Sequence, residues 1–353
     1  MPKLSPLSRS RPRAEELTAD IAARHLRAGD AYLTAEAAGR MLGCSRATAH
    51  RVLQRLCQRG VLVSRPGSGT FIGPGGQTGT TPAPRSLHVL IPQGFHRTTM
   101  GPLTGLIKSL AAGLGGVGVD FHTFPAGFDF SHLEAALGEA HDAGRVAAVL
   151  ALGCHWSVHR YLKDRGLPAF VIGSMFPDRQ FLSSMDRDVT QSANLLVDDL
   201  VKSGHRRFLL VAAASGLAGV DLFTDGVGRR LAFHGLPPGA LNIRHCHGET
   251  SVTKDRIRET LQNPQHPTAI LTDEEELAEV AHAAARTAGL AVPERVEIVF
   301  SGSLLRTGEP TSYPHTRSVL EPDELAEKIS RLLRDLPGTG SPQAHRIPVA
   351  LAL

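Results

Sequence analysis

From residue 87 onward, short apolar runs with the character of β-strands alternate with longer stretches of helical periodicity. Eight such runs lie at 87–91, 117–123, 147–152, 169–172, 208–212, 242–246, 269–271 and 297–300. Helical patterns separate them at 102–114, 131–143, 158–165, 190–202, 224–234, 253–261 and 275–287. Alternation with short connections is typical of α/β proteins whose parallel sheets are covered by helices on both faces. Eight strands over this length favour two doubly wound lobes over a single sheet.

The segment before this region predicts three short helices. The first covers 14–26, and the second, 34–42, begins at Thr34 as its expected N-cap. The three-residue turn 43–45 leads into a third helix that ends at Gly60. Two short helices joined by a turn that contains glycine indicate a helix-turn-helix.

The helix predicted over 45–59 separates an apolar face from a basic one. At about 100° per residue, its apolar side chains fall within a narrow arc. They are Ala49, Val52, Leu53 and Leu56. The helix also carries four arginines and no carboxylate, namely Arg46, Arg51, Arg55 and Arg59. Such a surface can neutralise phosphates and reach base edges, although an ordinary solvated basic face has the same composition.

A β-hairpin is predicted directly after this helix. Residues 61–64 and 70–72 have strand character, and 65–69 form a tight turn. Gly67 and Gly69 in that turn allow the backbone to approach a phosphate closely. Helix, turn, helix and hairpin in this order predict a winged helix-turn-helix.

Residues 13–73 resemble the DNA-binding domain of the GntR family of bacterial transcription regulators, through the sequence from Ser45 to Ile72. The resemblance implies DNA contacts from the helix and from the wing. They are Ser45, Arg46, Thr48, His50 and Arg51 on the helix, and Arg65, Gly67 and Ser68 at the wing. Arg46 is the best candidate for reading a base, because arginine bonds bidentately to guanine. Family members often have arginine where this chain has Glu36 and His50, so we expect a different operator.

A Gly- and Pro-rich segment divides the chain. Residues 73–84 contain four glycines and three prolines, which predicts a linker rather than part of a core. We therefore expect a winged helix-turn-helix domain over 1–73, a linker over 74–86 and a two-lobed domain over 87–353. The linker either lets the DNA-binding domains of two chains adjust to the two half-sites of an operator or serves as a passive tether.

Charge is divided in the same way as the domains. Residues 1–86 hold 13 basic and 5 acidic side chains, whereas residues 87–353 hold 25 basic and 29 acidic ones. A basic segment beside an acidic one indicates a polyanionic partner for the first. With the helix-turn-helix pattern, that partner is predicted to be duplex DNA.

The larger domain resembles the periplasmic-binding-protein-like effector domain of LacI/GalR regulators. The resemblance rests on the segment 185–210, on Asp225-Gly226 with 235–237, on 269–273, and on 315–322 before a last helix. It implies a homodimeric repressor of sugar-utilisation genes with a ligand site between the lobes.

Ligands of such folds bind in the crevice at the carboxyl ends of the strands. The residues expected there are His96, His155, Trp156, Phe176, Asp186, Phe223 and Asp273. The resemblance implies that Asp273 accepts hydrogen bonds from sugar hydroxyls. Trp156 is expected either to stack on a sugar or to fill the core between the lobes. Phe223 replaces a sugar-binding arginine of the family, and 300–303 replace its Gly-Phe-Asp motif, which favours a more apolar, modified or absent effector over an ordinary hexose.

Other classes of protein find little support. No strand is followed by a GxGxxG or GxxxxGK[ST] motif, and no GxSxG or HExxH motif occurs, so we expect neither an enzyme nor a bound cofactor. Cys154-His155 with His159, and 245–247, lack a third ligand at fixed spacing, so no metal is expected. The absence of a signal peptide, of a long apolar run and of paired cysteines predicts a cytoplasmic protein with reduced thiols.

Two functions are compatible with these features. The first is a ligand-responsive repressor of a carbohydrate-utilisation operon that binds a pseudo-palindromic operator as a homodimer. The second is a constitutive DNA-binding and dimerisation protein whose effector domain has lost sugar binding, an alternative favoured by Phe223.

Overall fold

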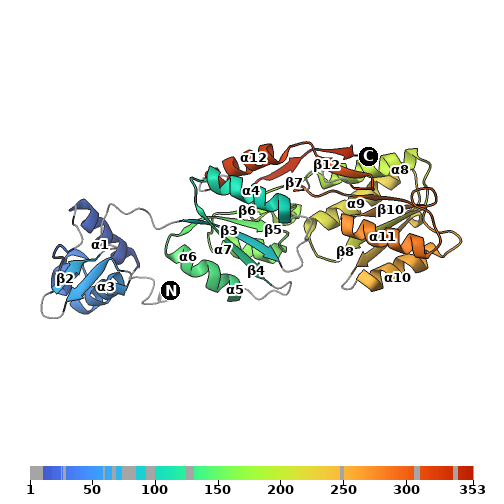
Figure 1. The fold of residues 1–353 in the computed structure, drawn as a ribbon. Helices are drawn as coiled ribbons and strands as arrows, with labels where there is room; N and C mark the ends of the chain where they lie inside the picture. The colour runs from blue at the N-terminus through green and yellow to red at the C-terminus, as the bar shows by residue number, and fades with distance from the viewer. Residues whose placement is uncertain are drawn as a thin grey trace. The chain divides into compact units, whose positions relative to one another are not determined.

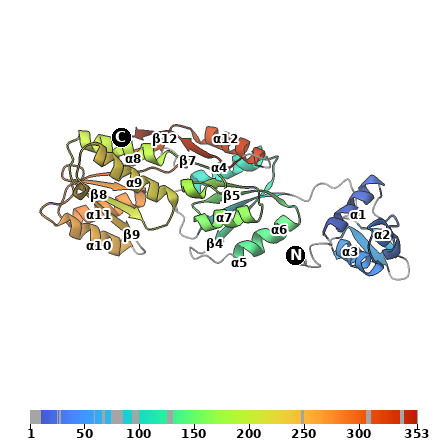
Figure 2. The ribbon, with the colours of Figure 1, turned by 180° about the vertical axis from the view of Figure 1, so that it is seen from behind.

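A computed structural model describes most of the chain, which divides into two compact units, Met1–Ala83 and Pro84–Leu353. The described residues are 11–24, 26, 29–58, 60–65, 69–73, 85–92, 100–124, 131–246, 250–305, 311–336 and 341–352. Figures 1 and 2 show their helices and strands from two sides. In the described residues no helix is both long enough and apolar enough to cross a membrane.

The first unit is a winged helix-turn-helix, as predicted. Its elements are α1 (Arg11–Ala23), α2 (Ala35–Met41), α3 (Arg46–Gln58), β1 (Leu62–Arg65) and β2 (Gly69–Ile72). The two strands pair antiparallel. Thr34 caps α2, because its hydroxyl accepts a hydrogen bond from the Ala37 amide over 3.2 Å.

The core of the first unit lies between the apolar faces of its helices and the base of the wing. The predicted apolar arc of α3 is buried in that core together with side chains of α1, β1 and β2: Leu17, Ile21, Ala49, Val52, Leu53, Leu56, Leu62 and Ile72. Gly43 in the turn between α2 and α3 has φ +57°, a conformation that glycine adopts without strain. Local periodicity therefore determines this unit.

The second unit contains two sheets of six strands each. The first sheet has the order β13-β7-β6-β5-β3-β4 and is parallel throughout. Its strands are β3 (Ser86–Pro92), β4 (Gly118–Phe124), β5 (Val146–Leu152), β6 (Ala169–Ile172), β7 (Ser183–Arg187) and β13 (Ala344–Ile347). The helices around it are α4 (Met100–Gly113), α5 (Ser131–Leu133), α6 (Glu139–Asp142), α7 (Trp156–Asp164) and α12 (Pro322–Asp335). A π-helical turn, Glu134–Gly138, joins α5 to α6 within the single helix predicted at 131–143.

The second sheet has the order β14-β12-β11-β10-β8-β9. Its strands are β8 (Phe208–Ala213), β9 (Leu241–Cys246), β10 (Ala269–Thr272), β11 (Glu297–Phe300), β12 (His315–Ser318) and β14 (Val349–Ala352). Only the β12–β14 pair is antiparallel among the described ladders of this sheet. Its helices are α8 (Val189–Lys202), α9 (Ala218–Phe233), α10 (Thr250–Leu261) and α11 (Glu275–Thr287). A short 3₁₀ turn lies at Pro238–Ala240 before β9, and another at Pro177–Arg179 lies between β6 and β7 of the first sheet. The two-lobed α/β fold predicted from the sequence is confirmed.

The chain passes between the two lobes at three places, from β7 to α8, from β12 to α12 and from β13 to β14. Helix α12 packs along α4 of the first lobe in both views. Leu304 and Leu305, which follow β11 of the second lobe, pack into the core of the first lobe. The lobes therefore share a border to which both contribute residues.

Candidate functional site

The outer face of α3 presents polar and basic side chains to solvent. Ser45, Arg46, His50 and Arg51 are exposed, and Thr48 is half-buried. The Ser45 hydroxyl accepts a hydrogen bond from the Thr48 amide over 3.3 Å and lies 3.0 Å from the Thr48 hydroxyl. Ser45 is therefore the N-cap of α3, and Arg46 extends from the first position of the helix.

The wing begins at the end of β1. Arg65 is the last residue of that strand and pairs with Gly69, whose φ is +105°. The side chain of Arg65, the predicted wing residues Gly67 and Ser68, and the predicted ligand contact His96 lie outside the described residues.

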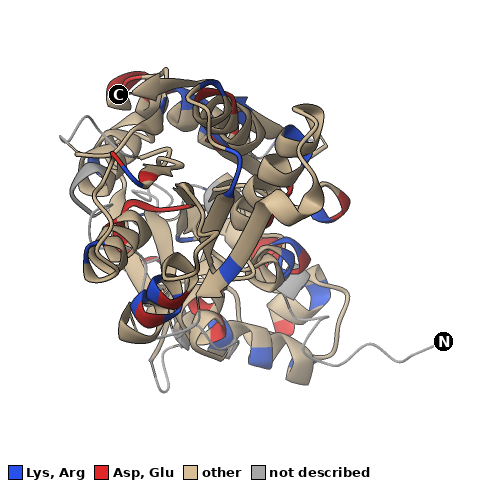
Figure 3. Ribbon diagram, turned by 90° about the vertical axis from the view of Figure 1, so that its right-hand side faces the viewer, with Lys and Arg blue, Asp and Glu red and all other residues tan. Residues whose placement is uncertain are grey.

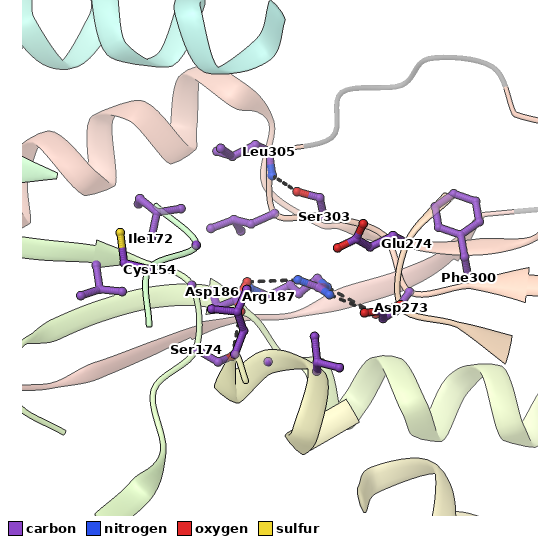
Figure 4. Close-up of a pocket in the computed structure, with 18 of the residues that line it drawn as sticks. Cys154, Ile172, Ser174, Asp186, Arg187, Asp273, Glu274, Phe300, Ser303 and Leu305 are labelled. Carbon is purple, nitrogen blue, oxygen red and sulfur yellow. Dashed lines mark hydrogen bonds and ion pairs between the residues drawn. The ribbon is translucent and has the colours of Figure 1, made fainter. Parts of the chain in front are cut away.

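A cavity of about 190 Å³ lies between the two lobes. Residues of both lobes line it, at the carboxyl ends of parallel strands where ligands of such folds bind. Those of the first lobe include Cys154, His159, Ile172, Ser174, Asp186 and Arg187. Those of the second lobe include Val220, Asp273, Glu274, Phe300, Ser301, Ser303 and Leu305. In Figure 4, Asp186 and Arg187 lie between Cys154 and Ile172 on one side and Asp273 and Phe300 on the other.

Asp186 has hydrogen-bond partners for both carboxylate oxygens. Ser174 donates its hydroxyl to Oδ2 over 2.7 Å. The backbone amide of Arg187 and its guanidinium Nη1 donate to Oδ1 over 2.8 and 3.3 Å. Asp186 lies in the cavity as predicted, and its charge is matched by Arg187.

Arg187 also connects the lobes, and it was not among the ligand contacts predicted from the sequence. Its Nε and Nη2 donate to the Ser301 hydroxyl over 3.4 and 3.3 Å. The Ser301 hydroxyl lies 3.0 Å from the buried hydroxyl of Ser192, which in turn bonds to Thr316. The sole sequence signal for Arg187 is its place beside Asp186 in the segment that resembles LacI/GalR regulators.

Asp273 is buried, with a relative exposure of 4%. Its Oδ2 accepts a hydrogen bond from the Ala213 amide over 3.1 Å, whereas Oδ1 has no hydrogen-bond partner in the described part of the chain. Burial, with a smaller effect of the Glu274 charge, raises the pKa of Asp273 to about 7. The predicted sugar-binding carboxylate therefore lines the cavity with one oxygen unsatisfied.

His159 is a second unsatisfied group in the cavity lining and was not predicted as a ligand contact. The side chain is 3% exposed, and neither ring nitrogen has a partner among the described residues. Burial, and to a smaller extent His155, lowers the pKa of His159 to about 4. The ring is therefore neutral at pH 7.

Three of the predicted ligand contacts, His155, Trp156 and Phe176, do not line this cavity. His155 caps α7, with its Nδ1 2.9 Å from the Ser157 hydroxyl. The guanidinium of Arg179 lies 4.7 Å from the ring centroid of Trp156 and 5.8 Å from that of Phe176. Trp156 is half-buried beneath Arg179, so it neither lines the cavity nor fills the core between the lobes.

Phe223 requires a correction. Its side chain is fully buried in the core of the second lobe, where it packs with Leu196, Val227 and Leu231. It does not line the cavity. Helix α9 begins at Ala218 rather than at the predicted Thr224, so Phe223 lies one turn before Val227 on the buried face.

The described residues contain no group of three or more His, Cys, Asp and Glu side chains that could hold a metal ion. His155 and His159 lie one turn apart, but Nδ1 of His155 is engaged with Ser157. His247 of the second candidate cluster lies outside the described residues.

Comparison with known families finds a match within each of the two units. Residues 13–72 match the gntR family of bacterial regulatory proteins, and residues 197–352 match the periplasmic binding protein-like domain. No match to a curated protein was found.

Solved structures with the same fold include LacI-family regulators. The Lac repressor bound to ONPG has 17% identity and a TM-score of 0.64, with 87% of this chain and 89% of that chain covered. A LacI-family regulatory protein from Chloroflexus aggregans has 19% identity and a TM-score of 0.62, with 76% and 96% covered. A LacI-family transcriptional regulator from Bifidobacterium animalis subsp. lactis has 16% identity and a TM-score of 0.60, with 76% and 96% covered. The chain is thus a transcription regulator in which a DNA-binding domain that matches the gntR family is joined to a domain that matches the periplasmic binding protein-like domain and has the fold of LacI-family regulators.

Proposed function

We propose that this regulator represses transcription by binding a pseudo-palindromic operator as a homodimer, and that a small ligand between the lobes changes its affinity for that operator. The main observation in support of DNA binding is that α3 is amphipathic. Its apolar face is buried, whereas Ser45, Arg46, His50 and Arg51 are exposed.

In this proposal, α3 enters the major groove with its first turn toward the bases. Arg46 at the first helical position reads a guanine, because its guanidinium can bond to O6 and N7 together. Arg51 and the wing residues Arg65, Gly67 and Ser68 contact the phosphates and fix the position of the helix. His50 and Thr48 are the further candidates for contacts to base edges.

The acidic excess of the larger domain supports the proposal that the N-terminal domain, rather than the larger domain, binds DNA. The domain carries more carboxylates than basic groups, and Figure 3 shows both signs of charge spread over its helices. A surface of this kind does not favour a second contact with DNA. Binding is therefore expected to depend on the N-terminal domain.

The cavity supports the ligand-responsive part of the proposal. A ligand that contacts both lobes stabilises one arrangement of the lobes over another. The ligand changes the affinity for the operator when these two arrangements place the DNA-binding domains differently. The unsatisfied Oδ1 of Asp273 favours a ligand site over a body that only dimerises. The resemblance to LacI/GalR regulators suggests that the target genes serve the use of a carbohydrate.

Selection of bound duplexes from a random library by the full chain tests the DNA-binding part. The proposal predicts that one pseudo-palindromic sequence is enriched and that a gel-shift assay shows selective binding to it. Enrichment without a shared sequence would contradict it. Sedimentation of the complex measures the number of chains per operator, for which the proposal predicts two.

A further inference from the structure

We propose that His159 is a ligand-binding residue, and that the effector is a largely apolar molecule with two hydroxyl groups, one bonded to His159 in the first lobe and one to Asp273 in the second. The inference rests on the proposed function, in which the cavity between the lobes is the ligand site. Neither point follows from the fold, because one fold can hold sites for very different ligands.

The side chain of His159 is buried without a hydrogen bond. It belongs to α7, lines the cavity and is 3% exposed. Neither ring nitrogen has a partner in the described part of the chain. An imidazole buried in this way loses its hydrogen bonds to water and gains none from the protein, which lowers the stability of the fold. A ligand in the cavity would restore a hydrogen bond.

Asp273 presents a matching group on the second lobe. Its Oδ2 accepts a hydrogen bond from the Ala213 amide, whereas Oδ1 has no partner among the described residues. In the described cavity lining, His159 and Asp273 are the two residues with a buried side-chain atom that lacks a hydrogen bond. One comes from each lobe, so a ligand that bonds to both would stabilise the arrangement in which the two lobes enclose it.

The other polar side chains of the described lining already have partners. They include a hydrogen-bonded network of Ser174, Asp186, Arg187 and Ser301. The Ser303 hydroxyl accepts a hydrogen bond from a backbone amide over 3.2 Å. The glutamates at 274–276 have interaction partners as well. A molecule with many hydroxyl groups would therefore compete with these interactions for its own hydrogen bonds.

A hydroxyl group can pair with either residue, whatever the position of the residue's proton. Burial lowers the pKa of His159 to about 4, so at pH 7 one ring nitrogen donates and the other accepts. A hydroxyl can bond to either nitrogen, because it both donates and accepts, whereas an ammonium only donates and a carboxylate only accepts. Burial raises the pKa of Asp273 to about 7, and a hydroxyl can donate to its ionised form or accept from its protonated form.

Apolar side chains of both lobes form much of the remaining cavity wall. They are Val171, Ile172, Leu217, Val220, Leu304 and Leu305. A hydrocarbon gains free energy when it is buried against such side chains, whereas a hydroxyl group that finds no partner there loses it. A dihydroxy compound with a hydrocarbon body therefore fits the described lining better than a hexose does.

Thermal-shift measurements and calorimetric titration of the full chain with two diols test the inference. The probes are cyclohexanedimethanol and the flexible hexanediol, each with its hydroxyl groups at opposite ends, and the matched mono-alcohols are cyclohexylmethanol and hexanol. We expect each diol to raise the melting temperature of the wild-type chain more than its mono-alcohol does, because a ligand of the folded state stabilises it. Glucose should raise it less than either diol.

Substitutions of His159 test its role directly. His159→Leu removes the ring nitrogens and keeps a side chain of similar size. The affinity for a diol should fall about tenfold, to that of the mono-alcohol, because one hydrogen bond is lost. His159→Gln should retain part of the affinity, since its amide both donates and accepts. Without ligand, His159→Leu should melt at or above the wild-type temperature, because it removes a buried polar group that has no partner.

His282→Leu is the matched control. His282 lies on α11 outside the described cavity lining, and its Nδ1 is 3.0 Å from the Tyr313 hydroxyl. The two substitutions change helix propensity equally, but His282→Leu also removes a hydrogen bond. We therefore expect this variant to melt below the wild-type temperature and to respond to the diols like the wild type.

Three results would overturn the inference. Equal affinities of the wild type and His159→Leu for the diols, or no response of the wild type to either diol, would remove His159 as a binding residue. A ligand-free His159→Leu variant that is destabilised as much as His282→Leu would show that the imidazole has a structural partner. A larger shift by glucose than by either diol would show a site for sugars, and the ligand-responsive repressor would stand without an apolar effector.

Operator affinity separates this inference from the proposed function. Gel-shift assays with and without the diols measure it for the wild type and for His159→Leu. Diols that bind through His159 but leave the affinity for the operator unchanged would support the inference and contradict the ligand-responsive part of the proposed function. Diols that change this affinity in the wild type alone would support both.

Discussion

Arg187, the last residue of β7 in the first lobe, donates hydrogen bonds from Nε and Nη2 to the hydroxyl of Ser301 in the second lobe, over 3.4 and 3.3 Å. The same guanidinium donates to Asp186. One side chain thus holds the carboxylate at the end of β7 and joins the two lobes beside the cavity.

Arg187→Ala should destabilise the larger domain. The substitution leaves the nearly buried carboxylate of Asp186 without its charge partner and removes the two hydrogen bonds from the guanidinium to Ser301, which should lower the free energy of unfolding by about 3 kcal/mol. Urea unfolding followed by the fluorescence of Trp156, the only tryptophan, measures it. Arg229→Ala, which removes an exposed pair with Asp225, should change stability by less than about 0.5 kcal/mol. Equal effects of the two substitutions would contradict the role of Arg187.

Gly302→Ala and Gly228→Ala should have opposite effects on stability. A Cβ at Gly302 would overlap the carbonyl oxygen of Thr316, so the backbone near Ser301 must move, at a cost of about 3 kcal/mol. A Cβ at Gly228 in α9 would meet no atom, and alanine is favoured over glycine in a helix by about 1 kcal/mol. Melting temperatures of the two variants check both signs. A stable Gly302→Ala variant would show that this backbone is not tightly packed.

Asp273 should make stability depend on pH. Its pKa is raised from the ordinary value of 3.8 to about 7 in the folded chain. The contribution of Asp273 to the free energy of unfolding is therefore fully present below pH 3.8 and is lost as the pH rises to 7. Asp273→Asn removes this dependence, and the Asn side chain can still accept the hydrogen bond from Ala213. The stability of the variant relative to wild type should grow between pH 4 and pH 7, to at most about 4 kcal/mol, and then stay constant. Urea unfolding at pH 5, 6, 7 and 8 tests this. A difference independent of pH would contradict the raised pKa.

Substitutions at Ser45 should separate capping from DNA contact. Ser45→Ala removes the acceptor for the Thr48 amide and should cost about 1 kcal/mol of stability. Ser45→Asp retains a capping oxygen but places a negative charge on the proposed DNA-binding face. We expect Ser45→Asp to melt near the wild-type temperature and to bind operator more weakly than Ser45→Ala. The reverse order of affinities would place Ser45 away from the phosphates.

Local patterns in the sequence predict the N-terminal domain well. The periodicity of α3, the N-cap Thr34 and the turn glycine Gly43 each depend on neighbours within a few residues, and the structure has all three. In the larger domain the strands of continuous apolar composition were also predicted, because an apolar run is a local feature of the sequence. Their positions and the two-lobed fold agree with the structure.

Three of the four strands of the larger domain that were not predicted, β7, β12 and β13, contain polar residues. Strand β7, Ser183–Arg187, has a buried centre, but its sequence contains serine, aspartate and arginine and therefore has no apolar pattern that would predict a strand. Its Asp186 and Arg187 find their partners at Ser174 and Ser301, which no local pattern connects. Strands β12, β13 and β14 were missed as well. The number of strands per sheet was therefore underestimated.

The ligand contacts predicted on helices were placed less well than the fold, because their positions depend on where each helix begins. Asp186 and Asp273 lie at the ends of strands and do line the cavity. Trp156 and Phe223 belong to α7 and α9, which begin two and six residues earlier than the periodicity indicated. That difference places Phe223 in the core and Trp156 beside Arg179.

The most direct test of the account is the affinity of the full chain for its selected operator, measured by fluorescence anisotropy for the wild type, Arg46→Ala and Arg24→Ala. Arg24 is a control because it lies after α1 and is paired with Asp20. The account predicts that Arg46→Ala loses roughly 10- to 100-fold in affinity for the operator, and much less for a duplex with the contacted base pair changed, because it loses a base contact worth about 1–3 kcal/mol. Arg24→Ala should bind like the wild type. Unchanged operator affinity of a folded Arg46→Ala variant would contradict the claim that α3 reads the operator.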